Sequence, residues 1–283
     1  MWGMSFAPRA AALALLALSA CAGARLPAPA AAAPERWRTI FADEFDGPDG
    51  APPDRQRWTF DTGGWGWGNQ ELQYYLDGAG NAFQRGGRLH LVARAGDVEG
   101  LDCWYGPCAY GSARITTKGQ FAFTHGKVSA RLKVPKGQGL WPAFWMLGAN
   151  IDGVPWPACG EIDVMEVVGR EPRVSHGTIH APGAFGPKGP SGTWSPARGE
   201  VGDEFHVFAV EREPGRLRFS VDGEPYATRT PADLPPDAMW VFEHDFVLLL
   251  NLAVGGTWPG APDASTSFPA ELLVDWVRVE VRE

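Results

Sequence analysis

Basic residues are scarce in this chain. Its 283 residues include 25 Lys and Arg against 33 Asp and Glu, so the formal net charge is −8 at pH 7. Because nucleic acids and other acidic polymers are bound by clustered Lys and Arg, this balance argues against such partners. Only 20% of the residues are charged and 45% are hydrophobic, which excludes a disordered protein. A substrate or partner should therefore be neutral or basic.

Patterns typical of helices are also lacking, since no window of about a dozen residues has a helical period. Instead, hydrophobic and polar residues alternate at 127–134, and Asp222-Gly223 supplies a hairpin turn. Residues 246–254 are apolar on both faces and should form a central strand. Further strands are predicted at 89–93, 205–211, 216–221 and 272–281. We therefore predict an all-β protein, a sandwich of two antiparallel sheets with a groove across one of them.

The N-terminal residues are typical of an export signal. Arg9 precedes an apolar stretch at 10–18, too short for an ordinary membrane span, and small residues lead to Cys21. This ending is similar to a bacterial lipobox, so we predict a lipoprotein-type signal peptide at 1–21 and possible membrane attachment through lipidated Cys21. Cleavage after Ala24 is the alternative and would release the protein. The Ala/Pro-rich residues 22–36 are predicted to be a linker, followed by one folded domain at 37–283.

Cysteine is rare, and three residues remain beyond the signal: Cys103, Cys108 and Cys159. In the oxidising compartment that an exported protein enters, Cys103 and Cys108 could close a small disulfide loop at a turn. Cys159 would then be a free thiol. Zinc is a poor interpretation because these cysteines lack the paired CxxC spacing of zinc sites.

One segment concentrates acidic residues, with Glu161, Asp163 and Glu166 inside 160–168. In a regular strand, Glu161 and Asp163 share a face and Glu166 points to the other. One extra residue accommodated as a β-bulge near Val164-Met165 would return Glu166 to the face of the other two acids. The two Glu carboxyls could then approach the ~5 to 5.5 Å of retaining glycosidases, and the inverting range of about 6.5 to 9.5 Å fits as well.

Carboxyl groups placed side by side suit general acid catalysis. Adjacent like charges split pKa values, so one group stays ionised as a nucleophile while its neighbour keeps a proton. A solvated acidic strand face or a calcium site is the alternative for such a motif taken alone.

The acidic segment resembles the active-site strand of glycoside hydrolase family 16, in the bulged form with an extra residue before the last Glu. Further segments are similar to laminarinase-type endo-β-1,3-glucanases: 63–75 (GGWGWGNQELQYY), 112–117 (SARITT), 139–148 (GLWPAFWMLG), 176–183 (HGTIHAPG) and 251–260 (NLAVGGTWPG). The resemblance implies a β-jelly-roll sandwich with the substrate groove on the concave sheet, and a catalytic domain at 37–283. It implies a retaining double displacement on a β-1,3-glucan, with Glu161 as nucleophile, Asp163 as its electrostatic partner and Glu166 as acid/base.

Aromatic residues include 13 Trp against 5 Tyr. Flat indoles suit the apolar faces of sugar rings. Trp141 and Trp145 are four apart and share a strand face, and the resemblance places both beside the glycosyl site. It also implies that His180 bonds sugar near the acids, and that Asn69 and Arg114 contact sugar on the non-reducing side. For Arg114 the rival interpretation is an ion pair with the acidic cleft.

No cofactor is expected for catalysis by two carboxylates. Many family members hold a structural calcium on the sheet opposite the cleft, and the resemblance implies Glu44, a backbone carbonyl near Gly87 and Asp275 as its ligands here. The Cys103 to Cys108 loop looks like an insertion, which leaves the chemistry intact and the sugar-subsite preferences open. We expect an exported monomer, lipid-anchored at the cell envelope or secreted.

Two rival functions keep the same fold. One is the same mechanism on another β-glucan or a galactan. The extra Met165 disfavours the lichenase and xyloglucan branches, whose strand is the unbulged E-x-D-x-E, and few Lys and Arg in the loops disfavour sulfated galactans. The other is a non-catalytic β-glucan-binding protein. Relatives that only bind lose one or more of the acids, and here all three are present.

Overall fold

Two large β-sheets make up most of the regular structure. The computed structural model describes residues 1–3, 36–96 and 98–283. The predicted signal peptide, Cys21 and the predicted linker lie outside these residues, apart from Met1–Gly3 and Arg36. Residues 36–283 form one compact unit. Among the described residues, no helix has both the length and the apolar character needed to cross a membrane.

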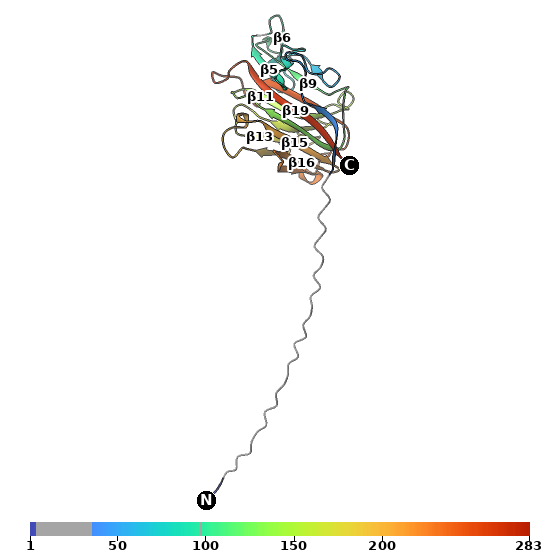
Figure 1. Cartoon of the computed structure of the whole chain (residues 1–283), viewed down its shortest axis with the longest axis vertical. Coiled ribbons are helices and arrows are strands. Elements are labelled where there is room, and N and C mark those ends of the chain that lie inside the picture. Colours follow the sequence, from blue (N-terminus) through green and yellow to red (C-terminus); the bar gives the residue numbers. More distant parts are fainter. Residues whose placement is uncertain (4–35, 97) are drawn as a thin grey trace. The chain divides into compact units, whose positions relative to one another are not determined.

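The larger sheet has ten strands, in the order β17-β16-β15-β10-β19-β5-β8-β3, with β1 paired to β19 and β4 paired to β5. The red arrow of β19 crosses the middle of this sheet in Figure 1. Its strands, in chain order, are β1 (Trp37–Asp43), β3 (Gln73–Tyr75), β4 (Ala82–Gln84), β5 (Leu89–Ala95), β8 (Tyr110–Ser112), β10 (Gly126–Lys133), β15 (His206–Glu213), β16 (Arg216–Val221), β17 (Glu224–Arg229) and β19 (Ala270–Arg282).

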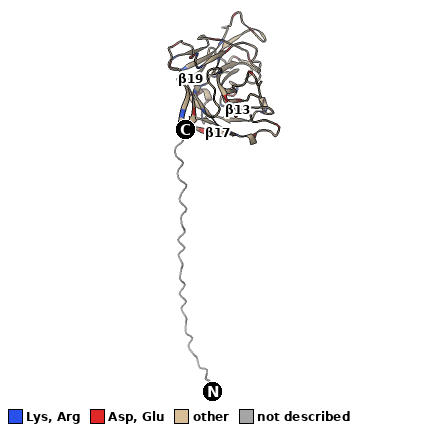
Figure 2. Cartoon of the chain, turned by 90° about the vertical axis from the view of Figure 1, so that its right-hand side faces the viewer, with Lys and Arg blue, Asp and Glu red and all other residues tan. Residues whose placement is uncertain are grey.

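The second sheet has seven strands, in the order β14-β13-β12-β11-β18-β9-β2, and all its neighbours pair antiparallel. In the view turned by 90°, β13 of this sheet and β19 of the larger one lie on opposite sides of the molecule (Figure 2). Its strands are β2 (Thr59–Asp61), β9 (Arg114–Thr116), β11 (Leu140–Gly148), β12 (Glu161–Glu166), β13 (Ser175–His180), β14 (Ser191–Trp194) and β18 (Phe246–Val254).

The predicted central strand is confirmed. Every residue of β18 is buried, and the strand lies between β11 and β9. Leu248, Leu250 and Leu252 belong to the core cluster between the sheets, whereas Asn251 and Ala253 line a cleft on the opposite face. Because alternate residues of a strand point to opposite faces, one face of β18 fills the core and the other forms the floor of that cleft.

The predicted sandwich of two antiparallel sheets is confirmed with one exception, because β3 and β8 pair in parallel. These strands are not consecutive, and four strands, β4 to β7, lie between them in the chain, which leaves a connection long enough for parallel pairing. A separate two-stranded sheet joins β6 (Asp102–Cys103) to β7 (Gly106–Pro107). Three short 3-10 helices complete the described elements: η1 (Gly186–Lys188), η2 (Val201–Asp203) and η3 (Pro231–Asp233).

Candidate active site

The acidic strand β12 contains the predicted β-bulge. On the β11 side, Trp145 pairs with Asp163 while the preceding residue of β11 pairs with Met165, so Val164 has no partner of its own. On the β13 side, the register shifts between Asp163 and Glu166. Val164 and Met165 both join the hydrophobic core. The extra residue therefore turns Glu166 to the face that Glu161 and Asp163 already occupy.

A cleft of about 930 Å³ lies over this face of the seven-stranded sheet, with the three acids on its floor. Strand β12 is third in the order of seven strands, so residues line the cleft on both sides of the acids. Residues that line it include Trp65, Trp67, Asn69, Glu71, Arg114, Trp141, Trp145, Trp156, Glu161, Asp163, Glu166, His176, His180, Ser191, Asn251 and Trp258.

His180 lies among the acids. Its Nε2 is 3.1 Å from Asp163 Oδ2 and 3.7 Å from Glu161 Oε1. The Gly186 backbone N–H donates to His180 Nδ1 at 3.1 Å, so Nδ1 accepts and the proton of the neutral ring lies on Nε2, facing the acids. Glu161, Asp163 and His180 offer ligand atoms within 4.8 Å of one another, a spacing that a metal ion could bridge. In the neutral ring, however, the Nε2 proton occupies the position that a metal would need.

Burial perturbs all three carboxyl groups. The pKa of Glu161 is raised to about 8, mainly by loss of hydration and to a smaller extent by the charge of Asp163. Burial also raises the pKa of Asp163 to about 8. It raises the pKa of Glu166 well above its usual value, with Asp163 and Glu161 adding to the effect. Because like charges repel one another in one buried cluster, the three carboxyl groups do not all ionise together.

The predicted tryptophans of β11 lie on the cleft side of the sheet. Trp141 Nε1 donates a 3.0 Å hydrogen bond to Glu166 Oε1, so this indole touches the proposed acid directly. Trp145 Nε1 donates to Asn251 Oδ1 at 2.7 Å. These bonds fix the plane of each ring against the floor of the cleft.

Arg114 and Asn69 also line the cleft, and their contacts with sugar stay a prediction. The Arg114 guanidinium lies between two indoles, 4.6 Å from the centre of the Trp67 ring and 4.8 Å from that of Trp145. Its Nε is 2.8 Å from Asp61 Oδ2, so an ion pair is present, with Asp61 as the partner. Arg114 thus positions aromatic rings and presents a charge that Asp61 already offsets.

Sequence reasoning missed Glu71, a buried carboxyl on the cleft wall. Its Oε2 accepts from Gln73 Nε2 at 2.7 Å and from the Tyr75 hydroxyl at 3.3 Å. Asn251 Nδ2 donates to that hydroxyl at 3.1 Å, so Glu71 is linked to Asn251 and through it to Trp145. Burial raises the pKa of Glu71 to about 6. Glu71 lies within the segment 63–75, whose resemblance to laminarinases could have pointed to a role in the cleft.

The predicted cysteine pairing is confirmed. Cys103 and Cys108 form a disulfide, and Cys159 is a buried free thiol. Burial and the nearby Glu161 raise the pKa of Cys159 to about 11, so this thiol stays protonated and unreactive at neutral pH.

The two carboxylates predicted to bind calcium contact arginine side chains instead. Both carboxylate oxygens of Glu44 accept hydrogen bonds from Arg278, at 2.8 and 2.9 Å. Asp275 Oδ2 accepts from Arg131 at 2.6 Å, and its Oδ1 lies 3.5 Å from Arg88. Guanidinium groups beside both carboxylates are a poor fit for a divalent cation. The calcium site, with its backbone ligand at Gly87, stays a prediction.

The sequence and fold are similar to those of known proteins. The family model described as "Glycosyl hydrolases family 16" matches residues 78–278. The chain belongs to glycosyl hydrolase family 16. It is 40% identical over 252 residues to the beta-glucanase of Rhodothermus marinus, covering 86% of this chain and 85% of that one.

Two solved structures of this family resemble the whole folded unit. The endo-beta-1,3-glucanase of Pyrococcus furiosus is 42% identical with a TM-score of 0.82, over 88% of this chain and 96% of that one. The catalytic domain of the Thermotoga petrophila laminarinase is 40% identical with a TM-score of 0.81, over 88% and 99%. The predicted jelly-roll fold of glycosyl hydrolase family 16 is therefore confirmed, and enzymes of this family need no catalytic cofactor.

Proposed function

We propose that this family 16 hydrolase cleaves β-1,3-glucan chains from within by a retaining double displacement. The observation that carries the proposal is the bulge of β12, which brings the partly buried Glu161 and the buried Asp163 and Glu166 onto one cleft floor. The names of the similar enzymes support the substrate class. A cleft whose lining extends on both sides of β12 suits an internal position on a polymer.

Each acid has a separate role in this mechanism. Glu166 protonates the glycosidic oxygen of the leaving chain as the Glu161 carboxylate attacks the anomeric carbon. Asp163 lies beside Glu161 in the cluster and is the electrostatic partner of that nucleophile. The Glu166 carboxylate then takes a proton from water, whose oxygen displaces Glu161 and frees the product with its original anomeric configuration.

The cleft also bears on the rival substrates. Among the described residues that line it, Arg114 is the one Lys or Arg, and Asp61 pairs with it. Sulfated galactans need several cationic contacts, so this lining favours a neutral glucan. Export, attachment through Cys21 and a monomeric state stay predictions from the sequence.

A substrate panel tests the proposal. We expect the purified protein to release reducing ends from laminarin at a kcat/KM at least about tenfold higher than from mixed-linkage glucan or agarose, because its sequence and fold are similar to those of endo-β-1,3-glucanases. Product analysis by NMR at early times should show the β-anomer first. The α-anomer first would contradict the retaining mechanism, and laminarin binding without new reducing ends would favour a non-catalytic binding protein.

Replacing Trp141 tests the role of Glu166 through the pH profile. The bond from Trp141 lowers the pKa of Glu166, so Trp141→Phe should raise that pKa further. An acid catalyst is active while protonated and loses activity as the pH rises through its pKa. We therefore expect the alkaline limb of kcat/KM on laminarin to move to higher pH. Trp145→Phe is the matched control, because its indole bonds Asn251 and the alkaline limb should stay in place.

A further inference from the structure

Residues 63–72, between β2 and β3, form one wall of the cleft. Trp65, Trp67, Asn69 and Glu71 of this segment all line it. Trp67 folds back so that its Nε1 donates to Gly63 O at 3.1 Å, which holds the indole upright beside the cleft.

The backbone of this wall is strained. Positive φ angles occur at Gly63, Gly66 and Gly68, and also at two residues with side chains, Trp67 at 48° and Gln70 at 57°. Residues other than glycine adopt this region at an energetic penalty and keep it where the surrounding structure enforces it. The wall therefore depends on contacts from outside its own sequence.

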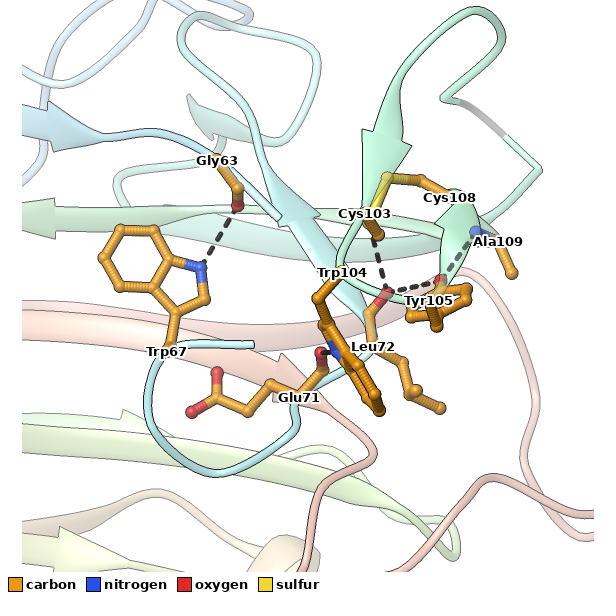
Figure 3. The surroundings of a disulfide bond; sticks show 9 residues. All are labelled: Gly63, Trp67, Glu71, Leu72, Cys103, Trp104, Tyr105, Cys108 and Ala109. Atoms are coloured by element: carbon orange, nitrogen blue, oxygen red, sulfur yellow. Dashed lines mark hydrogen bonds between the residues drawn. A yellow bond between two sulfur atoms is a disulfide. The ribbon is translucent and has the colours of Figure 1, made fainter. Parts of the chain in front are cut away.

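The loop closed by the disulfide supplies such contacts, and Figure 3 shows Trp104 and Tyr105 reaching from it toward the wall. Trp104 N donates to Gly64 O and Trp104 Nε1 donates to Glu71 O, both at 2.8 Å. The Tyr105 hydroxyl donates to Leu72 O at 2.7 Å and accepts from Ala109 N at 2.9 Å. Backbone carbonyls near both ends of the wall are thus bonded to one small loop.

Two glycines of the wall let the loop approach this closely. A Cβ on Gly64 would lie 2.6 Å from Cys103 Sγ, and a Cβ on Gly66 would lie 3.0 Å from Trp104 Cδ1. Contacts as short as the first do not occur between real side chains, so the fit requires glycine at position 64. The wall and the loop are packed as one unit.

We propose that the Cys103–Cys108 loop is a positioning element that sets the affinity of the cleft for the distal sugar residues of a long glucan. The wall contacts Arg114 of β9 through Trp67, and β9 lies three strands from β12. At about 4.8 Å per strand, the backbone of β9 is about 14 Å from that of β12, and the Arg114 side chain reaches back to Trp145. This inference rests on the proposed glucanase function. Trp104 and Tyr105 are positioning residues, because they act on sugar through the wall.

Two variants test the loop. Tyr105→Phe removes the hydroxyl that bridges Leu72 O and Ala109 N and keeps the disulfide, whereas Cys103→Ser with Cys108→Ser opens the loop. Because each lost hydrogen bond is worth a factor of about three to ten, we expect KM for laminarin to rise about three- to tenfold for Tyr105→Phe and further for the double variant. The kcat on laminarin should stay within about twofold of the unmodified enzyme, since the acids are untouched.

A short substrate separates positioning from general damage. An aryl β-glucoside places its single sugar residue at the acids and none at the wall, so its kcat/KM should be unchanged in both variants. Tyr110→Phe is the matched control, because it removes a hydroxyl outside these contacts. An unchanged KM for laminarin in both variants would overturn the proposal, as would equal losses on the long and the short substrate.

Affinity electrophoresis in laminarin gels keeps this test independent of turnover. In a Glu161→Gln background the glucan is not consumed, so Tyr105→Phe should weaken retention by laminarin even if the hydrolytic roles of the acids were assigned wrongly. Undiminished retention would count against the loop alone. If the unmodified enzyme did not cleave laminarin but Tyr105→Phe still weakened retention, the result would count against the proposed hydrolysis and not against the role of the loop.

Discussion

Replacing Glu166 with Gln is expected to lower kcat on laminarin by about 10²- to 10⁴-fold, the usual contribution of a general acid/base. Gln has nearly the shape of Glu and can still accept the Trp141 hydrogen bond, but it cannot protonate the leaving oxygen. Glu161→Gln should cost at least as much, because it removes the attacking carboxylate. Reducing-end assays at saturating laminarin measure both effects.

Azide distinguishes the two roles. In Glu161→Ala the anion can enter the space left by the carboxylate and attack the anomeric carbon directly, which inverts the configuration and yields an α-glycosyl azide. In Glu166→Ala an aryl glycoside with a good leaving group still forms the glycosyl-enzyme, and azide then displaces Glu161 to yield a β-glycosyl azide. Exchanged anomers would reverse the assignment.

Glu224→Gln is the control, because Glu224 is exposed on β17 of the other sheet. Its activity should equal that of the unmodified enzyme. If Glu161→Gln or Glu166→Gln kept full turnover, with circular dichroism showing an intact fold, the two-carboxylate mechanism would be wrong for this chain.

The sequence allowed prediction of those features that follow from local spacing. A strand that is apolar on both faces had to be central, as β18 is. The spacing of three acids called for a bulge at Val164-Met165 before they could share a face, and the bulge is there. Both conclusions need only the alternation of side chains along a strand.

Contacts between distant segments could not be predicted in this way. The ion pair of Arg114 with Asp61 and the link from Glu71 through Tyr75 to Asn251 depend on which strands become neighbours. Asn251 did carry a local signal, as a polar residue within an apolar run, because its alternate position puts it on the cleft face. The links between the disulfide loop and residues 63–72 likewise depend on the fold around them.

Arg212 is a charged residue on the core face of its strand, where alternation predicts an apolar one. The predicted strand at 205–211 continues to Glu213, and Phe208, Val210 and Arg212 all turn toward the interior. Arg212 is 1% exposed, and burial lowers its pKa to about 9, so it still carries a charge at neutral pH. A charged residue on the core face is unexpected from sequence, because burial needs partners that only the folded chain supplies.

Those partners are backbone carbonyls of segments next to the active-site sheet. Arg212 Nη1 donates to Phe123 O at 3.0 Å, and Nη2 donates to Phe242 O and His244 O at 3.1 and 2.9 Å. The guanidinium also lies 4.4 Å from the centre of the Phe246 ring, at the start of β18. The side chain thus fixes the residues that lead into the floor of the cleft.

Arg212→Met should therefore destabilise the protein strongly. Methionine fills much of the volume but leaves buried carbonyls without their donor, at a cost of about 1–3 kcal/mol for each unsatisfied group. A total loss of about 3 kcal/mol or more corresponds to a fall in Tm of about 6–12 °C for a domain of this size. Differential scanning calorimetry at neutral pH measures it. Arg216→Met is the matched control, since Arg216 is exposed and pairs with Glu213 on the surface, where an ion pair is worth about 0–1 kcal/mol. Equal melting temperatures for the two variants would show that the buried guanidinium contributes no more to stability than a surface one.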